Sequence, residues 1–375
     1  MIRWLLLVAS ILIFAMGLVM IFSTSSAEVI DQDLTGGTHG AFLKQLFFGS
    51  VAALSFLWIS QIDFRKILRH SPKALVLLTC ALVLVLIPGI GKEVNGSKRW
   101  LSLVGFSFQP SEFLKLTVLA YFVHYGWNGR HLSLRHFFVL IFQLSIPLFL
   151  VMIEPNNGTV AVIAAVLVAL CFLAQISWRF WALPLLCFAA LGTSFAFKLP
   201  YVQGRIKSYL NPESDLRGKG HQPYQAKIAA GSGGLIGRGP GNSLQKLSYL
   251  PEAQNDYIAA IFAEEFGFLG ISSLIFLYMT LATLGYAVAM RAKDPRARLL
   301  AASYTFLIAL QAFLNLAVVS GLLPSTGLNL PFFSQGGSSL IANALALGVL
   351  WSIASDEQEN YHNNRRDRRA HLSLA

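Results

Sequence analysis

Ten apolar stretches separated by shorter polar segments dominate the pattern of this chain. They fall at about 4–23, 41–62, 73–88, 111–127, 136–153, 158–176, 178–199, 257–289, 299–323 and 336–354. Because a helix needs roughly 20 apolar residues to cross the hydrocarbon core of a bilayer, each stretch predicts a transmembrane helix. The eighth is long enough to tilt, to kink or to begin above the membrane. The pattern predicts an all-α, polytopic membrane protein with ten transmembrane helices.

Composition excludes the other broad classes of protein. Of the 375 residues, 55% are hydrophobic and only 13% are charged. A soluble fold of this length has too little interior for so much apolar surface, and a disordered chain would be far more polar. No cluster of cysteine and histidine has the spacing of metal ligands. No cofactor motif is evident, and the sequence leaves a requirement for a divalent cation open.

Positive charge is distributed unevenly between the two sides of the predicted bundle. The net charge is +11, and Lys and Arg are concentrated in the segments predicted to lie on the same side of the membrane as the N-terminus. The short loops 24–40, 154–157 and 323–335 on the other side hold none. By the positive-inside rule, both termini lie in the cytoplasm. We therefore expect residues 356–375 to form a basic cytoplasmic tail at the inner leaflet, and no nucleic-acid partner.

Residues 1–355 are expected to form a single transmembrane domain with one large outer loop at about 200–256 and a smaller one at 89–110. The large loop is rich in glycine, which predicts tight turns. Its segment also breaks the charge pattern, with Lys198, Arg205, Lys207, Arg217, Lys219, Lys227, Arg238 and Lys246 on the outer side. Two interpretations stay open. Anionic lipid head groups attract this segment, or it meets an anionic ligand at the outer leaflet.

Asp256 is the most informative acid, because it opens an apolar helix at the outer surface. One interpretation is an N-cap, since an Asp at that position accepts a hydrogen bond from a free backbone N–H. The other is a functional carboxylate. Glu264 and Glu265 follow in the same span, where ionisable groups are costly and are therefore paired or functional. We expect one of them to line a cavity below Asp256 and the other to pair with a neighbouring helix.

Three further constellations fall at outer helix ends. Arg99 precedes a helix whose first turns carry Glu112 and Lys115, spaced so that they can pair, although Lys115 could instead face an anion. Residues 154–159 read E-P-N-N-G-T, which is typical of a tight turn. Residues 331–339 open the last helix with small residues, whose backbone N–H groups could bind an anion.

In this order on ten spans, these motifs resemble the SEDS family (shape, elongation, division and sporulation). The resemblance runs from Gly17-Leu18-Val19-Met20 to Gly336-Gly337-Ser338-Ser339. It implies a peptidoglycan glycosyltransferase that polymerises lipid II at the outer face of the cytoplasmic membrane, beside a class B penicillin-binding transpeptidase. The acid that closes the family's P-E-x-x-x-D stretch is Asp256, the expected catalytic residue. The expected substrate-binding residues are Arg99, Lys115, Arg205, Glu112 and Glu264.

The string Gly241-Asn242-Ser243-Leu244-Gln245-Lys246 resembles the division branch of the family, which implies a septal location and other division proteins as partners, besides membrane lipids. Four positions in three motifs depart from the family pattern: Gln254 and Asn255 before Asp256, Asn156 where an Asp is common, and Gln335 in place of a Tyr. The alternatives are an elongation-type polymerase, a lipid II flippase and a non-catalytic division scaffold.

Overall fold

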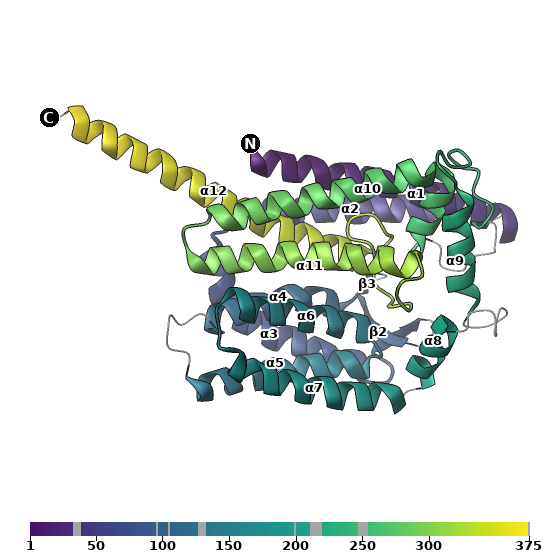
Figure 1. Ribbon diagram of the computed structural model, residues 1–375, viewed down its shortest axis with the longest axis horizontal. Helices are drawn as coiled ribbons and strands as arrows, with labels where there is room; N and C mark the ends of the chain where they lie inside the picture. Colours follow the sequence, from purple (N-terminus) through teal and green to yellow (C-terminus); the bar gives the residue numbers. More distant parts are fainter. Residues whose placement is uncertain are drawn as a thin grey trace.

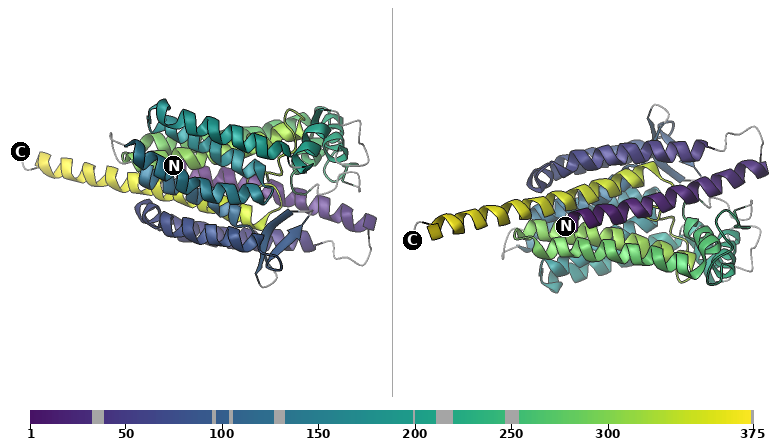
Figure 2. Two further views of the ribbon diagram at one scale, coloured as in Figure 1. Left: turned by 90° about the horizontal axis from the view of Figure 1, so that it is seen from below. Right: turned by 90° about the horizontal axis from the view of Figure 1, so that it is seen from above.

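The protein is a bundle of helices that run side by side (Figures 1 and 2). The computed structural model describes residues 1–32, 39–94, 97–103, 106–126, 133–198, 200–210, 220–246 and 254–373. Each apolar stretch predicted from the sequence forms a helix, which confirms the all-α fold class. The helices are α1 (Ile2–Gln32), α2 (Gly40–Ser60), α3 (Phe64–Leu86), α4 (Pro110–Gly126), α5 (Leu134–Ile153), α6 (Asn157–Leu173), α7 (Trp178–Lys198), α10 (Ile258–Arg291), α11 (Pro295–Val319) and α12 (Gly337–Ser373).

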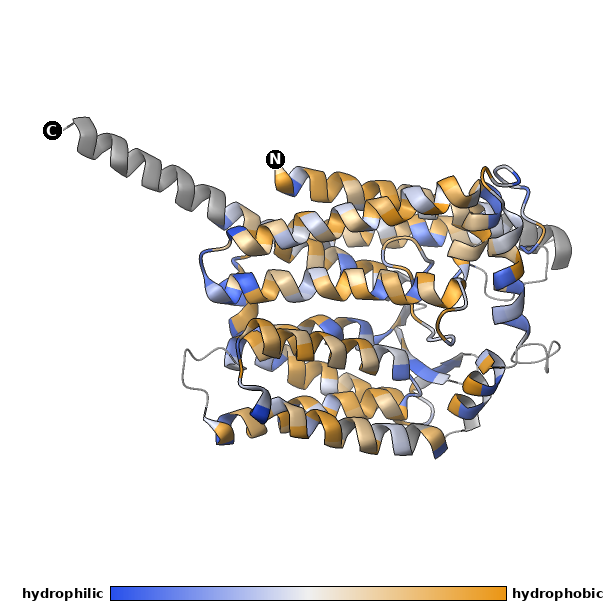
Figure 3. Cartoon of the chain, viewed as in Figure 1, coloured by the Kyte–Doolittle hydropathy of each residue, from blue (hydrophilic) through white to orange (hydrophobic). Residues whose placement is uncertain are grey.

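Seven of the described helices are long and apolar enough to cross a membrane. They are α1, α2, α3, α5, α10, α11 and the first part of α12, whereas α6 is apolar but shorter. Hydrophobic residues dominate along the bundle, and hydrophilic residues are concentrated toward its two ends (Figure 3). The chain is therefore a multi-pass membrane protein, and the number of ten crossings stays a prediction.

Short polar side chains fix several helix starts. The carboxylate of Asp63 accepts a hydrogen bond from the backbone N–H of Arg65 at the start of α3. Ser133 caps α5 in the same way. At α11, Asp294 accepts from the N–H of Arg296, and Pro295 occupies the first turn. Each side chain satisfies a donor that has no partner within its own helix.

Both chain termini lie at one end of the bundle, and the strands and short helices lie at the other (Figure 1). Within the bundle α12 packs beside α2, α10 beside α11 and α1, and α3 beside α4. The far end of α12 projects beyond its neighbours, so the backbone of the predicted tail continues the last helix (Figure 2). Termini at a common end agree with the expectation that they share one side of the membrane.

A small antiparallel sheet replaces the simple loop expected at 89–110. Its strands are β1 (Gly91–Val94), β2 (Ser97–Leu103) and β3 (Phe106–Phe108), in that order. Lys92 lies opposite Trp100, and Leu101 lies opposite Phe108. The sheet packs against α3, α4 and α12, so it holds β2 over the end of the bundle.

The expected large loop at 200–256 contains two helices, α8 (Pro200–Leu210) and α9 (His221–Ser232). After α9 the chain makes the tight turns that its glycines predicted, with positive φ at Gly234, Gly237, Gly239 and Gly241. α9 packs against α10 and α11, and it therefore belongs to the same part of the bundle as the helix that follows Asp256.

The long helix α10 is interrupted at Gly267, which has a φ of 66° and a ψ of −161°. The backbone of the preceding turns fills the break. Phe268 and Leu269 donate their N–H groups to the carbonyls of Gly234 and Leu235, while Glu264 and Glu265 accept from the N–H groups of Arg238 and Gly239. A Cβ at position 267 would lie 2.4 Å from the nitrogen of Gly237, so only glycine fits. Of the alternatives that the length of this span left open, the structure shows a kink.

Candidate functional site

A polar cavity of about 860 Å³ lies at the end of the bundle away from the termini. Its lining comes from α2, the sheet, the starts of α4 and α6, α8, α9, the turn before α10, and the segment between α11 and α12. The charged residues that line it are Lys44, Lys92, Arg99, Glu112, Lys227 and Asp256. Two of the predicted basic and acidic residues, Arg99 and Glu112, therefore share one cavity with Asp256.

Asp256 lies in a turn, two residues before the first residue of α10. The N-cap of α10 is Tyr257, so the interpretation of Asp256 as the cap is wrong. Two hydrogen bonds from neighbouring segments fix the backbone of this turn. The amide nitrogen of Asn315 on α11 donates to the carbonyl of Asp256 at 2.9 Å and to that of Leu328 at 2.8 Å. The N–H of Gln335 donates to the carbonyl of Gln254 at 3.0 Å. The carboxylate is thus presented by an anchored turn.

The side chain of Arg99 extends from β2 and donates hydrogen bonds to two backbone carbonyls. Its Nε donates to the carbonyl of Glu154 at 3.1 Å, and its Nη2 donates to the carbonyl of Pro155. The side chain is nearly buried, yet it lines the cavity. Since a guanidinium has five N–H donors in a fixed plane, these two bonds orient Arg99 and leave further donors for an anion.

The turn that holds Arg99 is itself buried. Asn156 donates from its amide to the hydroxyl of Ser111 at 3.2 Å and accepts from Thr159 at 3.0 Å. The Glu154 side chain is fully buried, and neither of its carboxyl oxygens has a hydrogen-bond partner among the described residues. Burial raises the pKa of Glu154 to about 8, and the charge of Arg99 opposes this shift. The acid is therefore mainly protonated near neutral pH.

Glu112 and Lys115 form a buried ion pair, with 2.8 Å between the carboxylate and the ammonium. Glu112 lines the cavity, while Lys115 is only 2% exposed and does not belong to its lining. The geometry favours the paired alternative that the sequence left open. Lys115 neutralises and orients Glu112 from below and has no direct access to the cavity.

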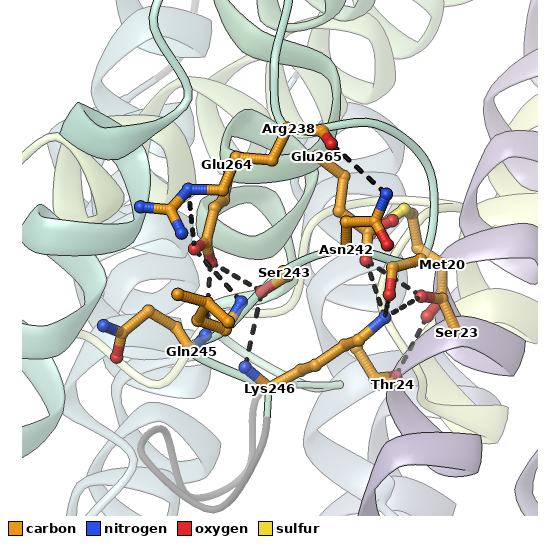
Figure 4. Close-up of polar contacts among 12 residues, drawn as sticks. Met20, Ser23, Thr24, Arg238, Asn242, Ser243, Gln245, Lys246, Glu264 and Glu265 are labelled. Atoms are coloured by element: carbon orange, nitrogen blue, oxygen red, sulfur yellow. Dashed lines mark hydrogen bonds and ion pairs between the residues drawn. The ribbon is translucent and has the colours of Figure 1, made fainter.

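Glu264 lies outside the lining of the cavity, so the expectation that it faces the substrate beneath Asp256 is wrong. The loop after α9 folds back onto α10, where it engages the carboxylate of Glu264 (Figure 4). Glu264 accepts from the hydroxyl of Ser243 at 2.5 Å and from the backbone N–H groups of Leu244 and Gln245, and it lies 3.5 Å from Nε of Arg238. The sequence could not show this return of the loop.

Glu265 pairs away from the cavity, as expected for one of the two acids. The ammonium of Lys246 lies 3.0 Å from its carboxylate and 2.9 Å from the hydroxyl of Ser23 on α1 (Figure 4). Ser23 also donates to Glu265 at 3.0 Å. We refer to Ser23, Lys246, Glu264 and Glu265, together with Ser243, as the loop clasp. It ties residues 238–246 to α10 and α1.

The remaining predicted residue, Arg205, belongs to α8, and its side chain lies outside the described residues. Sequence reasoning missed four residues of the site: Lys44, Lys92, Lys227 and Asn315. Lys227 was one of the outer cations, yet nothing in its spacing separates it from the others. Asn315 gives a weak signal as a polar residue within an apolar span.

Comparison with known proteins gives the family. The chain matches the cell cycle protein family of FtsW, RodA and SpoVE over residues 3–359. It is 37% identical to the probable peptidoglycan glycosyltransferase FtsW of Trichlorobacter lovleyi, over 93% of this chain and 92% of that protein. It is 35% identical to stage V sporulation protein E of Bacillus subtilis, over 93% and 96%.

Solved structures share the fold. A chain of a peptidoglycan synthase complex that coordinates polymerization and crosslinking has a TM-score of 0.76 and 25% identity, with 94% of this chain and 98% of that chain covered. RodA of Thermus thermophilus has a TM-score of 0.69 and 24% identity, with 94% and 97% covered. The fold and site thus define a multi-pass membrane protein with a polar cavity at one end. The chain belongs to the SEDS family and is FtsW-like in sequence.

Proposed function

We propose that this protein is a peptidoglycan glycosyltransferase that polymerises lipid II into glycan strands at the outer face of the cytoplasmic membrane. One observation carries the proposal: a single cavity brings the Asp256 carboxylate together with Arg99 and further cations. The chemistry requires both charges, because a base must accept a proton while a diphosphate leaves. The names of the relatives support the same reaction.

The reaction joins two lipid-linked sugars. A hydroxyl oxygen of the acceptor forms a bond to the anomeric carbon of the donor, and its proton passes to the carboxylate of Asp256. The bond between that carbon and the diphosphate oxygen breaks, and the electron pair leaves with the diphosphate. General-base assistance of this kind contributes typically 10²–10⁴-fold. Arg99, oriented by two carbonyls, stabilises the charge that develops on the leaving group.

Septal synthesis is the cellular role that the sequence supports best. The FtsW relatives are similar to this chain over nearly its whole length, and the 241–246 string resembles the division branch. An elongation-type polymerase is the alternative, which localisation of a tagged copy would decide: a septal band is expected, and a signal along the side wall would contradict the division role.

The proposed partner is a class B penicillin-binding transpeptidase, because a similar solved chain belongs to a complex for polymerization and crosslinking. The catalytic cavity then faces outward, and both termini, which share the opposite end, lie in the cytoplasm. Basic residues of the tail would contact anionic lipids of the inner leaflet.

Purified protein with its transpeptidase partner, supplied with lipid II, tests the reaction directly. Glycan strands resolved by size are expected from the wild type and are not expected from Asp256→Asn. A flippase would move lipid II across vesicles without forming strands, and a scaffold would support division equally well with Asp256→Asn. Either result would contradict the proposed enzyme.

A further inference from the structure

Lys227 enters the catalytic cavity from α9. Ala226 and Ala229 are the buried residues of this helix and fix it against its neighbours. Pro223 and Lys227 are four residues apart and lie on one face of the helix, and both line the cavity. Lys227 is exposed at the cavity wall, so its ammonium is available to a ligand.

The backbone after α11 leaves room for this side chain. Gly321 has a φ of +75°, and a Cβ there would lie 2.0 Å from Cε and 2.8 Å from Nζ of Lys227. Gly321 also ends α11 by donating to the carbonyl of Val318 at 3.0 Å. The aliphatic part of the Lys227 side chain therefore passes close to Gly321. Glycine at this position both allows the turn of the chain and leaves space for the neighbouring side chain.

The simplest structural role for Lys227 is a favourable interaction with the C-terminal end of α11. A residue in that role normally donates to one of the last carbonyls of the helix. Among the residues that the structure describes, none accepts a hydrogen bond from Lys227 or forms an ion pair with it. The ammonium reaches the cavity without a fixed partner, which favours a ligand.

The charge of the cavity points to more than one anionic group. The described lining carries four cations, Lys44, Lys92, Arg99 and Lys227, and two acids, Asp256 and Glu112. Glu112 is neutralised by Lys115. The reaction brings together two diphosphate-linked sugars, a donor that loses its diphosphate and an acceptor that keeps one. A separate group of cations for each of the two diphosphates is therefore useful within one cavity.

Lys227 and Arg99 belong to different structural units. Lys227 is on α9, which packs on α10 and α11, the helices that hold the turn of Asp256. Arg99 is on β2, which packs on α3 and α4. In a single displacement the attacking hydroxyl and the leaving diphosphate lie on opposite sides of the reacting carbon. The base therefore stands on the acceptor side, together with the unit that carries Lys227.

Resting on the proposed function, we propose that Lys227 binds the diphosphate of the acceptor, the lipid-linked disaccharide whose hydroxyl attacks. Arg99 then serves the departing diphosphate of the donor. Lys227 is a substrate-binding residue that sets the affinity for one of the two substrates and takes no part in proton transfer.

The test separates the two substrates. The donor is a lipid II with its attacking hydroxyl blocked, and the acceptor is a lipid II whose diphosphate is joined through a non-cleavable phosphonate. The full-length protein with its transpeptidase partner couples the two once, and the concentration of each is varied. For Lys227→Met we expect the KM for the acceptor to rise about tenfold, the lower end for a lost contact to a charged group, because the side chain is exposed.

The KM for the donor and kcat should change less than about twofold, and Lys227→Arg should restore most of the acceptor affinity, since it keeps the charge. Lys207→Met is the matched control, because Lys207 is an exposed cation of α8 outside the described cavity lining. An unchanged KM for the acceptor, or a rise confined to the donor, would overturn the assignment. A wild type that couples nothing would instead refute the proposed function itself.

Discussion

The amide nitrogen of Asn315 lies 2.9 Å from the backbone carbonyl oxygen of Asp256, and the same nitrogen bonds the carbonyl of Leu328. Asn315 is 1% exposed, so its amide is held within the bundle. The proposed base is therefore positioned through its main chain by a neighbouring helix, while its side chain remains in the cavity. The group that positions Asp256, its main-chain carbonyl, is thus distinct from the carboxylate that is proposed to act as the base.

Asn315→Ala should lower kcat about tenfold or more and leave the KM for lipid II nearly unchanged. The carbonyls of Asp256 and Leu328 lose their donor, which costs about 1–3 kcal/mol for the buried Leu328 contact and lets the turn of Asp256 shift. Steady-state strand synthesis and thermal unfolding in detergent measure the two effects. Gln311→Leu is the matched control, because Gln311 is a buried amide one turn earlier on α11. Equal losses in both variants would point to a general packing effect.

Asp256→Asn should reduce strand synthesis by at least 10²-fold and leave the unfolding temperature unchanged. The carbonyl that Asn315 holds is still present in this variant, so the turn keeps its main-chain anchor. Strand synthesis close to the wild-type rate would refute the general-base role.

Lys115→Met should destabilise the protein by about 3–5 kcal/mol, because it leaves the buried carboxylate of Glu112 without its cation. The double variant Glu112→Gln with Lys115→Met should recover most of this stability. Thermal unfolding of the two single variants and the double variant gives the coupling. If the double variant is as unstable as Lys115→Met alone, the ion pair is not what Lys115 contributes.

Lys246→Met should open the loop clasp. The Lys246 side chain is only 7% exposed and its partner Glu265 only 1%, so the loss leaves a buried charge. Hydrogen exchange of residues 233–246 should rise markedly. Arg238→Met is the internal control, since Arg238 is 37% exposed at 3.5 Å from Glu264 and its pair is worth about 1 kcal/mol at most. Similar exchange in both variants would show that the clasp does not hold the loop.

Glu154 predicts a pH dependence of stability. Its pKa is raised from 4.5 to about 8 in the folded protein, so the folded state holds a proton that the unfolded state releases between these values. The free energy of unfolding should therefore fall as the pH rises from about 5 to 8, by at most a few kcal/mol. Glu154→Gln should remove this fall and be more stable than the wild type at pH 8. Parallel unfolding curves for both proteins would contradict it.

Most of the bundle could be predicted from the sequence, because each span is a long apolar run bounded by polar residues. The length of α10 left a tilt, a kink or a start above the membrane open, and the contacts at Gly267 select the kink. The sheet at 91–108 and the helices α8 and α9 were not, since these segments are short and lack a clear period. Only packing against the end of the bundle selects their structure.

The site could be predicted only in part, because some of its residues are brought together by contacts between segments that are far apart in the sequence. Arg99, Glu112 and Asp256 share the cavity, as the family motifs implied. The expected role of Glu264 failed, because the returning loop, which the sequence pattern does not show, engages its carboxylate. Lys227 and Asn315 depend on contacts between segments far apart in the chain, which spacing along the sequence does not contain.

At the break at Gly267, hydrogen bonds join α10 to the turns at 234–239, so the two segments are expected to move together. Four backbone groups beside the break, on Glu264, Glu265, Phe268 and Leu269, are bonded to those turns, so straightening the helix would break these hydrogen bonds. A change in the tilt of the part of α10 that follows Gly267, such as a thinner or thicker bilayer imposes, is therefore expected to act on the turns at 234–239 as well. We therefore expect the thickness of the surrounding lipid to affect the turns at 234–239 together with the tilt of α10.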